Sequence, residues 1–162
     1  LVYFRSLRKF VIHSNKLKSL PSEELGELSN IEIMNLSQNI LKSIPESISK
    51  LANLKFLDVS HNHLESLPAS IGQMESLQVV NLSCNHLKSV PGGIGSLQLL
   101  QQIDLSQNNL SYLPSEICLL ETLRVLNISS NSLLCLPESF GSLQSLQVLD
   151  ATHNKVQVSY DL

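Results

Sequence analysis

A motif that recurs at a fixed interval is the feature that most constrains the fold of this chain. Its clearest marker is an asparagine, here called position n, which occurs at Asn15, Asn39, Asn62, Asn85, Asn108, Asn131 and Asn154. The first interval, from 15 to 39, is 24 residues, and every later interval is 23 residues. A constant period of about 20 to 50 residues is typical of solenoids, in which each repeat packs only against its neighbours. The period therefore predicts a repeat protein with one continuous core.

The third repeat shows what each unit should form. Apolar residues at n−5 and n−3, here Leu57 and Val59, alternate with mostly polar residues, which is the pattern of a strand with one buried face. The strand is expected to end at Asn62. Pro68 at n+6 should open a short helical or 3-10 turn, and Ile71 at n+9 should close the core behind the sheet.

The seven marker asparagines are predicted to form a structural ladder. A buried amide needs hydrogen-bond partners, and stacked asparagine side chains can bond the backbone of adjacent repeats. The ladder is therefore an architectural feature and not a binding site.

These observations predict an α/β solenoid with one parallel strand per repeat. A sheet of about seven strands, spaced roughly 4.8 Å apart, should line the concave face, with short helical or 3-10 turns on the convex face. Residues 1–162 should form a single domain. Leu1 falls at n+9 of a preceding repeat and Tyr160 replaces the proline of the seventh, so we expect a fragment that lacks its terminal caps.

Composition narrows the classes of partner. The formal net charge is −3 and the pI is near 5.9, so no overall basic charge favours nucleic acid. No apolar run approaches the roughly 20 residues of a membrane span. Three cysteines, Cys84, Cys118 and Cys135, include no CxxC pair, which favours reduced thiols and a cytoplasmic location.

The chain shows no pattern that indicates catalysis or a cofactor. No nucleophile, base and orienting acid stand out from the repeat consensus, and there is no glycine-rich phosphate loop. His61, His63, Cys84 and His86 share one edge of two adjacent repeats, and these are residue types that ligate zinc. The inward-turning asparagine between the two histidines should hold them apart, so exposed turn residues are the preferred interpretation. We therefore expect no enzyme, no cofactor and no metal site.

The unit LxxLxLxxNxLxxLPxxIxxL resembles the leucine-rich-repeat family over essentially the whole chain. Its 23-residue LPxxI form is similar to the intracellular type found in Ras-pathway scaffold, Scribble-like, Roco and death-domain leucine-rich-repeat proteins. The resemblance implies a right-handed horseshoe and protein–protein binding through the concave face or its rim. A small GTPase or a phosphatase is a partner implied by the resemblance alone.

The candidate protein-binding residues lie on the predicted concave face. The n−6 column contains Ile33, Phe56, Val79, Gln102, Val125 and Val148, and the n−4 column contains Asn35, Asp58, Asn81, Asp104, Asn127 and Asp150. The serine-rich n−2 column is also expected to face this side, with less weight as a binding surface. Ile33, Phe56 and Val79 should form an apolar stripe, and contiguous apolar surface usually indicates contact.

Three functions remain open from the sequence. The first is a non-catalytic interaction scaffold or recognition module. The second is a ligand-recognition ectodomain of a receptor or immune protein, for which the N-x-S sequons at Asn35, Asn81 and Asn127 would be glycan acceptors. The third is a regulatory segment of a larger signalling enzyme.

Overall fold

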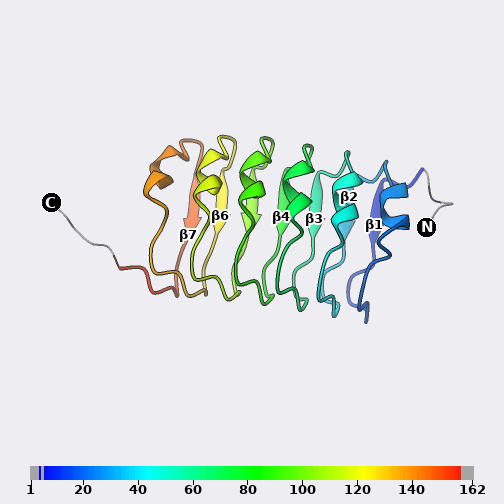
Figure 1. The fold of residues 1–162 in the computed structure, drawn as a ribbon, viewed down its shortest axis with the longest axis horizontal. Helices are drawn as coiled ribbons and strands as arrows, with labels where there is room; N and C mark the ends of the chain where they lie inside the picture. The colour runs from blue at the N-terminus through cyan, green and yellow to red at the C-terminus, as the bar shows by residue number, and fades with distance from the viewer. Residues whose placement is uncertain (1–3, 5, 158–162) are drawn as a thin grey trace.

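A computed structural model describes residue 4 and residues 6–157 of the chain. Leu1 and Tyr160, on which the expectation of missing caps rests, lie outside the described residues. Within them, a strand alternates with a 3-10 turn along the chain (Figure 1). The strands are β1 (Lys9–Val11), β2 (Ile33–Asn35), β3 (Phe56–Asp58), β4 (Val79–Asn81), β5 (Gln102–Asp104), β6 (Val125–Asn127) and β7 (Val148–Asp150).

The strands form one parallel sheet in chain order, β1 to β7. Equivalent positions of successive repeats pair directly, so that Ile33 lies opposite Phe56, which lies opposite Val79. This register follows from the 23-residue period, because each turn of the solenoid returns the chain to the same place one strand further along. The predicted fold class is confirmed.

A row of 3-10 turns lies on the side away from the sheet. The turns are η1 (Glu24–Glu27), η2 (Glu46–Lys50), η3 (Ala69–Gln73), η4 (Gly92–Ser96), η5 (Ser115–Leu119) and η6 (Glu138–Ser142). From η2 onward a proline directly precedes each turn; Pro45 accepts a hydrogen bond from the Ile48 N–H at 3.0 Å. In the first repeat the matching bond runs from Leu25 N–H to Pro21 O at 3.2 Å and spans one residue more, so this turn absorbs the extra residue of the 24-residue interval. No helix in the described part of the chain has the length and apolar character needed to cross a membrane.

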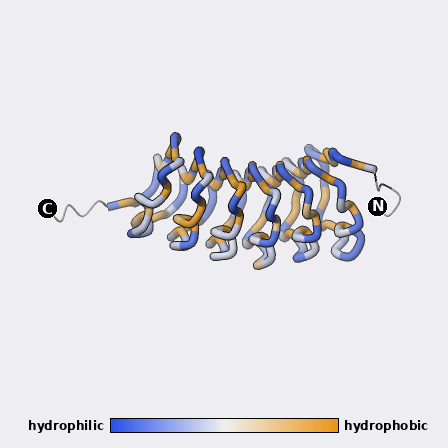
Figure 2. The backbone as a smooth tube through the Cα atoms, turned by 90° about the horizontal axis from the view of Figure 1, so that it is seen from above, coloured by the Kyte–Doolittle hydropathy of each residue, from blue (hydrophilic) through white to orange (hydrophobic). Residues whose placement is uncertain are grey.

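The core is a single apolar column between the sheet and the turns. It runs without a break from Leu25 to Leu143. Apolar residues recur in every rung of the hydropathy-coloured tube, while polar residues lie between them (Figure 2). The buried positions include the predicted n−5, n−3 and n+9, occupied in the fourth repeat by Val80, Leu82 and Ile94. Position n+12, occupied there by Leu97, is buried as well. Burial of this repeated apolar surface is the main source of stability.

The marker asparagines bond the backbone of their own and the preceding repeat. Asn85 is 4% exposed; its Nδ2 donates to Val59 O at 3.0 Å, Leu82 O at 3.0 Å and Ser83 O at 3.2 Å. Its Oδ1 accepts the Leu64 N–H at 3.0 Å. Asn39, Asn62, Asn108, Asn131 and Asn154 repeat this arrangement. Asn15 is exposed, and its Nδ2 donates to two carbonyls of its own turn.

The position at which each strand ends corrects one prediction. The strands end at n−4 and not at the asparagine, and the n−2 residues Ser60, Ser83 and Ser106 are buried beside the n−4 side chains. The cause is a change of backbone direction at n−1. There φ lies between 52° and 56° at Ser14, Gln38, His61, Cys84, Gln107, Ser130 and His153. This left-handed conformation ends the extended run of the strand and turns the chain towards the buried asparagine.

Substitutions at Gln107, where φ is 53°, can measure how much the left-handed conformation at n−1 lowers the stability of the protein. We expect Gln107→Gly to raise the free energy of unfolding by about 0.5 kcal/mol, because relief of the left-handed strain outweighs the added freedom of glycine in the unfolded chain. Gln107→Val should lower it by about 1–2 kcal/mol, because a β-branched side chain tolerates positive φ poorly. Urea unfolding of both variants gives the comparison. Equal midpoints for the glycine and valine variants would contradict this account of the turn.

Candidate protein-binding surface

The n−6 and n−4 side chains lie on the solvent side of the sheet, which is called the concave face from here on. In β2, Ile33 is exposed, Met34 is fully buried and Asn35 is half-buried, and β3 to β6 likewise have a buried central residue between two more exposed ones. In the terminal strands the central residues are less covered: Phe10 is half-buried and Leu149 is 41% exposed. Along the n−6 column Ile33, Gln102 and Val148 are exposed, whereas Phe56, Val79 and Val125 are half-buried; all six n−4 residues from Asn35 to Asp150 are half-buried. The geometry therefore brings the candidate residues onto one face, as two adjacent columns.

The most apolar part of the concave face lies over β1 to β4. Ile33, Phe56 and Val79 are direct neighbours in the sheet register, and Val11 beside them is 44% exposed. A shallow hollow of about 410 Å³ is lined there by Lys9, Val11, His13, Ile33, Asn35 and Phe56. Gln102 interrupts the stripe, which resumes at Val125 and the 53%-exposed Val148.

Three residues of this hollow were missed by the sequence-based prediction of the site. Lys9, Val11 and His13 occupy the n−6, n−4 and n−2 positions of the first repeat. They belong to the same columns as the predicted residues, so the repeat register was a sufficient signal to include them. They depart from the consensus residue types of those columns, and this departure is what makes the first repeat distinct.

The n−4 column alternates strictly between asparagine and aspartate. Its members are Asn35, Asp58, Asn81, Asp104, Asn127 and Asp150. In each repeat the Oδ1 atom accepts the backbone N–H two residues later, as in Asp58, which also accepts the Ser60 hydroxyl at 2.7 Å. These bonds hold the n−2 residue beside the n−4 side chain. The Oδ1 atom of each n−4 side chain therefore has a structural role.

The second carboxylate oxygen of each aspartate is left for other partners. Asp104 Oδ2 accepts a bond from Asn127 Nδ2 of the next strand at 3.3 Å. Alternation with asparagine keeps the carboxylates two strands apart, or about 10 Å, which limits their mutual repulsion. At Asp150, the Thr152 N–H and hydroxyl lower the carboxyl pKa, so this group stays ionised at neutral pH. The concave face thus combines an apolar column with a row of spaced negative charges.

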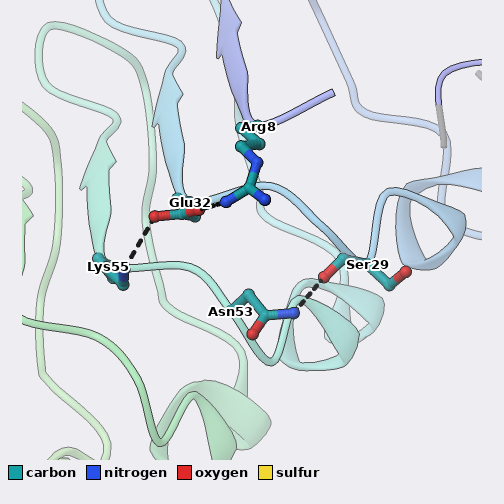
Figure 3. A network of polar contacts seen from close by, with 5 residues as sticks. All are labelled: Arg8, Ser29, Glu32, Asn53 and Lys55. Carbon is teal, nitrogen blue, oxygen red and sulfur yellow. Dashed lines mark hydrogen bonds and ion pairs between the residues drawn. The ribbon is translucent and has the colours of Figure 1, made fainter. Parts of the chain in front are cut away.

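An ion-pair network lies where the first three strands begin. Glu32 accepts Arg8 from the preceding repeat at 2.5 Å and Lys55 from the following repeat at 2.8 Å (Figure 3). Hydrogen bonds from Lys55 and then Arg8 lower the Glu32 carboxyl pKa. Because all three side chains are substantially exposed, the network contributes little to stability. Its one carboxylate offsets only one of the two positive charges, so the group keeps a net charge of +1 beside the start of the first three strands.

The histidine and cysteine side chains considered for zinc do not converge. His63 and His86 stack with ring centroids 5.5 Å apart, while His61 is exposed and Cys84 is half-buried. Across the described residues, no three His, Cys, Asp or Glu side chains are grouped to hold a metal ion. Burial raises the thiol pKa of Cys84 and of Cys118, which keeps both thiols protonated and weakly nucleophilic at neutral pH.

Comparison with known proteins agrees with this architecture. The family described as "Leucine-rich repeat region" matches residues 77–160, and the family described as "Leucine rich repeat" matches residues 5–64. No match was found among curated protein sequences.

Many solved structures are similar to the chain, and two of them are described here. A leucine-rich-repeat protein of Leptospira interrogans is 33% identical with a TM-score of 0.93, over 98% of this chain and 40% of that one. TLR13, in its complex with the single-stranded RNA ssRNA13, is 27% identical with a TM-score of 0.86, over 97% of this chain and 23% of that one. The chain thus spans less than half of either protein. The repeat pattern, the parallel sheet and these matches together show that the chain belongs to the leucine-rich-repeat family.

Proposed function

We propose that this chain is a non-catalytic recognition module that binds a protein partner through its concave face. The observation that carries the proposal is the solvent-facing apolar stripe of exposed Ile33 and half-buried Phe56 and Val79, which continues into the hollow of the first repeat. Such a stripe costs free energy in water and stabilises a complex when a partner covers it. Aromatic anchors near the centre of an interface carry much of the binding energy, and Phe56 is the aromatic residue of this stripe.

The charges on the concave face indicate the chemistry of the partner. Asp58, Asp104 and Asp150 present carboxylates about 10 Å apart beside the apolar column. A partner with apolar side chains flanked by lysine or arginine would match both columns. The same carboxylates oppose phosphate groups, so we favour protein over nucleic acid on this face. The RNA in the TLR13 complex is a ligand of that protein.

The remaining parts of the proposal concern cellular context. We propose a cytoplasmic signalling or scaffold role, because Cys84, Cys118 and Cys135 are all free thiols and suit a reducing compartment. A small GTPase or a phosphatase is the class of partner that the 23-residue LPxxI type suggests.

The double variant Phe56→Ala/Val79→Ala tests the proposal. It should weaken binding of a captured partner by about tenfold or more, because it removes the centre of the stripe. Capture from cell extract, followed by titration of the identified partner against the purified variants, gives the measurement. The fold should survive, because both side chains lie on the outer side of the sheet.

A matched control separates loss of the site from general loss of apolar surface. Leu99→Ala/Leu119→Ala removes two exposed apolar side chains, 49% and 58% exposed, outside the concave face. This control should retain the partner. If the partner instead left with the control and stayed with the concave variant, the binding surface would be on the other side of the solenoid.

A further inference from the structure

A second exposed surface runs along the side of the solenoid where the chain leaves each strand. This surface, called the exit edge, consists of the n+1 and n+3 side chains. Its backbone is held in register by hydrogen bonds from each n+1 N–H to the n+2 carbonyl of the preceding repeat. Three successive examples are Ile40 to Leu17 at 3.1 Å, His63 to Leu41 at 2.9 Å and His86 to Leu64 at 2.9 Å. The n+1 and n+3 side chains therefore form two regular columns.

In the first four repeats the exit edge is positively charged. It contains the lysines Lys16, Lys18, Lys42 and Lys88, against the single carboxylate of Glu65. Lys88 pairs with Glu65 at 3.3 Å, whereas the other three lysines form no ion pair with any residue that the structure describes. A local excess of three positive charges is notable in a chain whose net charge is −3. In the next two repeats these positions hold Asn109, Ser111, Ser132 and Leu134, which are uncharged.

A hollow lies within this charged segment. It has a volume of about 430 Å³ and is lined by Lys18, Ile40, Lys42 and His63. Ile40 is half-buried and provides an apolar wall, while His63 lies nearly parallel to His86, with 11° between the ring planes. Two lysines beside an apolar wall and a flat ring can accept an apolar or aromatic side chain with a carboxylate on either side of it.

We propose that the exit edge of repeats one to four binds an acidic peptide segment, with one aromatic or aliphatic side chain in the hollow and flanking carboxylates on Lys18 and Lys42. This site lies on a different surface from the concave face and selects the opposite charge. It therefore goes beyond the proposed function and does not depend on it. Charge complementarity at an exposed edge of this kind chiefly speeds association and gives specificity.

Fluorescence anisotropy with a labelled peptide, a tyrosine flanked on both sides by glutamates, tests this site. At low ionic strength the wild-type protein should bind the peptide, and added salt should weaken the complex because exposed charges are screened. Lys18→Glu/Lys42→Glu should weaken binding by about tenfold or more. The control Arg124→Glu/Lys155→Glu makes the same change in net charge at exposed positions away from the hollow and should change affinity less than about twofold.

Changes to the ligand provide a test that does not depend on variant folding. Replacing the tyrosine of the peptide with serine should weaken binding, because the hollow would lose its apolar occupant. The proposal is overturned if the wild-type protein does not bind the acidic peptide, or if the Arg124/Lys155 control loses as much affinity as the Lys18/Lys42 variant. It is also overturned if a single-stranded RNA of equal charge binds more tightly than the peptide, since the edge would then be a nucleic-acid surface.

Discussion

Replacing Asn85 with leucine is expected to lower the free energy of unfolding by about 3 kcal/mol, because a buried backbone donor loses its acceptor. That donor is the Leu64 N–H, which bonds Asn85 Oδ1. The three carbonyls that accept bonds from Asn85 Nδ2 are less affected, because each accepts a second hydrogen bond. The second donors are Asn62 Nδ2 for Val59 O, Asn108 Nδ2 for Leu82 O and the His61 N–H for Ser83 O. The unsatisfied Leu64 N–H should therefore make the largest contribution to the loss of stability, and the lost bonds to the three carbonyls a smaller one.

Denaturant unfolding of matched variants measures this contribution. Asn109→Leu alters an exposed residue of an adjacent turn and should change stability by less than about 0.5 kcal/mol. Asn15→Leu should have a smaller effect than Asn85→Leu, because Asn15 is exposed and its amide bonds only its own turn among the contacts described. An Asn85→Leu midpoint equal to that of wild type would show that the ladder is not needed for stability.

Gly95→Ala is expected to destabilise the protein by about 3 kcal/mol, because there is no room for a methyl group between adjacent repeats. A Cβ atom at Gly95 would lie 2.3 Å from the carbonyl oxygen of Glu116 and 3.0 Å from its carbonyl carbon. Gly72 makes an even closer approach, 2.1 Å to Gly93 O. Both obstacles are backbone atoms of the next turn, so the stacked turns would have to move apart.

Gly141→Ala is the matched control, since Gly141 occupies the same n+10 position in the sixth repeat. Among the described residues, no atom beyond its chain neighbours and its own turn lies within 4 Å of the position that an added methyl group would take, and the φ of Gly141 is not positive. Alanine should therefore stabilise the protein by about 0.4–1 kcal/mol, through the reduced freedom of the unfolded chain. Thermal and denaturant unfolding should show opposite signs for the two substitutions. If both lowered stability equally, a general requirement for glycine would replace the account based on close packing.

The sequence was sufficient to predict the architecture because the same physical pattern is repeated in every unit. The parallel sheet, its register and the proline-initiated turns follow from the spacing of residues such as Leu57, Asn62 and Pro68. The left-handed conformation at n−1 could not be predicted in this way. Residues such as His61 and Cys84 adopt it without the glycine that usually indicates it.

The candidate surface was predictable in position but not in chemical detail. Strand alternation places Phe56 and Asp58 on the concave face. In each n−4 side chain Oδ1 is bonded to the n−2 residue, as between Asp58 and Ser60. This bond depends on the local backbone conformation and has no separate sequence signal. The hollow lined by Lys9 and the hollow beside Ile40 depend on how side chains of adjacent repeats pack, which the spacing of the repeat does not specify. Recognition by the concave face remains a prediction.

Methyl NMR of the protein with its captured partner tests the central claim most directly, namely that residues varying between repeats on the concave face carry recognition. Addition of the partner should shift or broaden the methyl signals of Ile33, Val79 and Val125, while those of Leu99 and Leu119 stay unchanged. Perturbation of Leu99 and Leu119 with unchanged Ile33 and Val79 signals would contradict the account and place the binding surface outside the concave face.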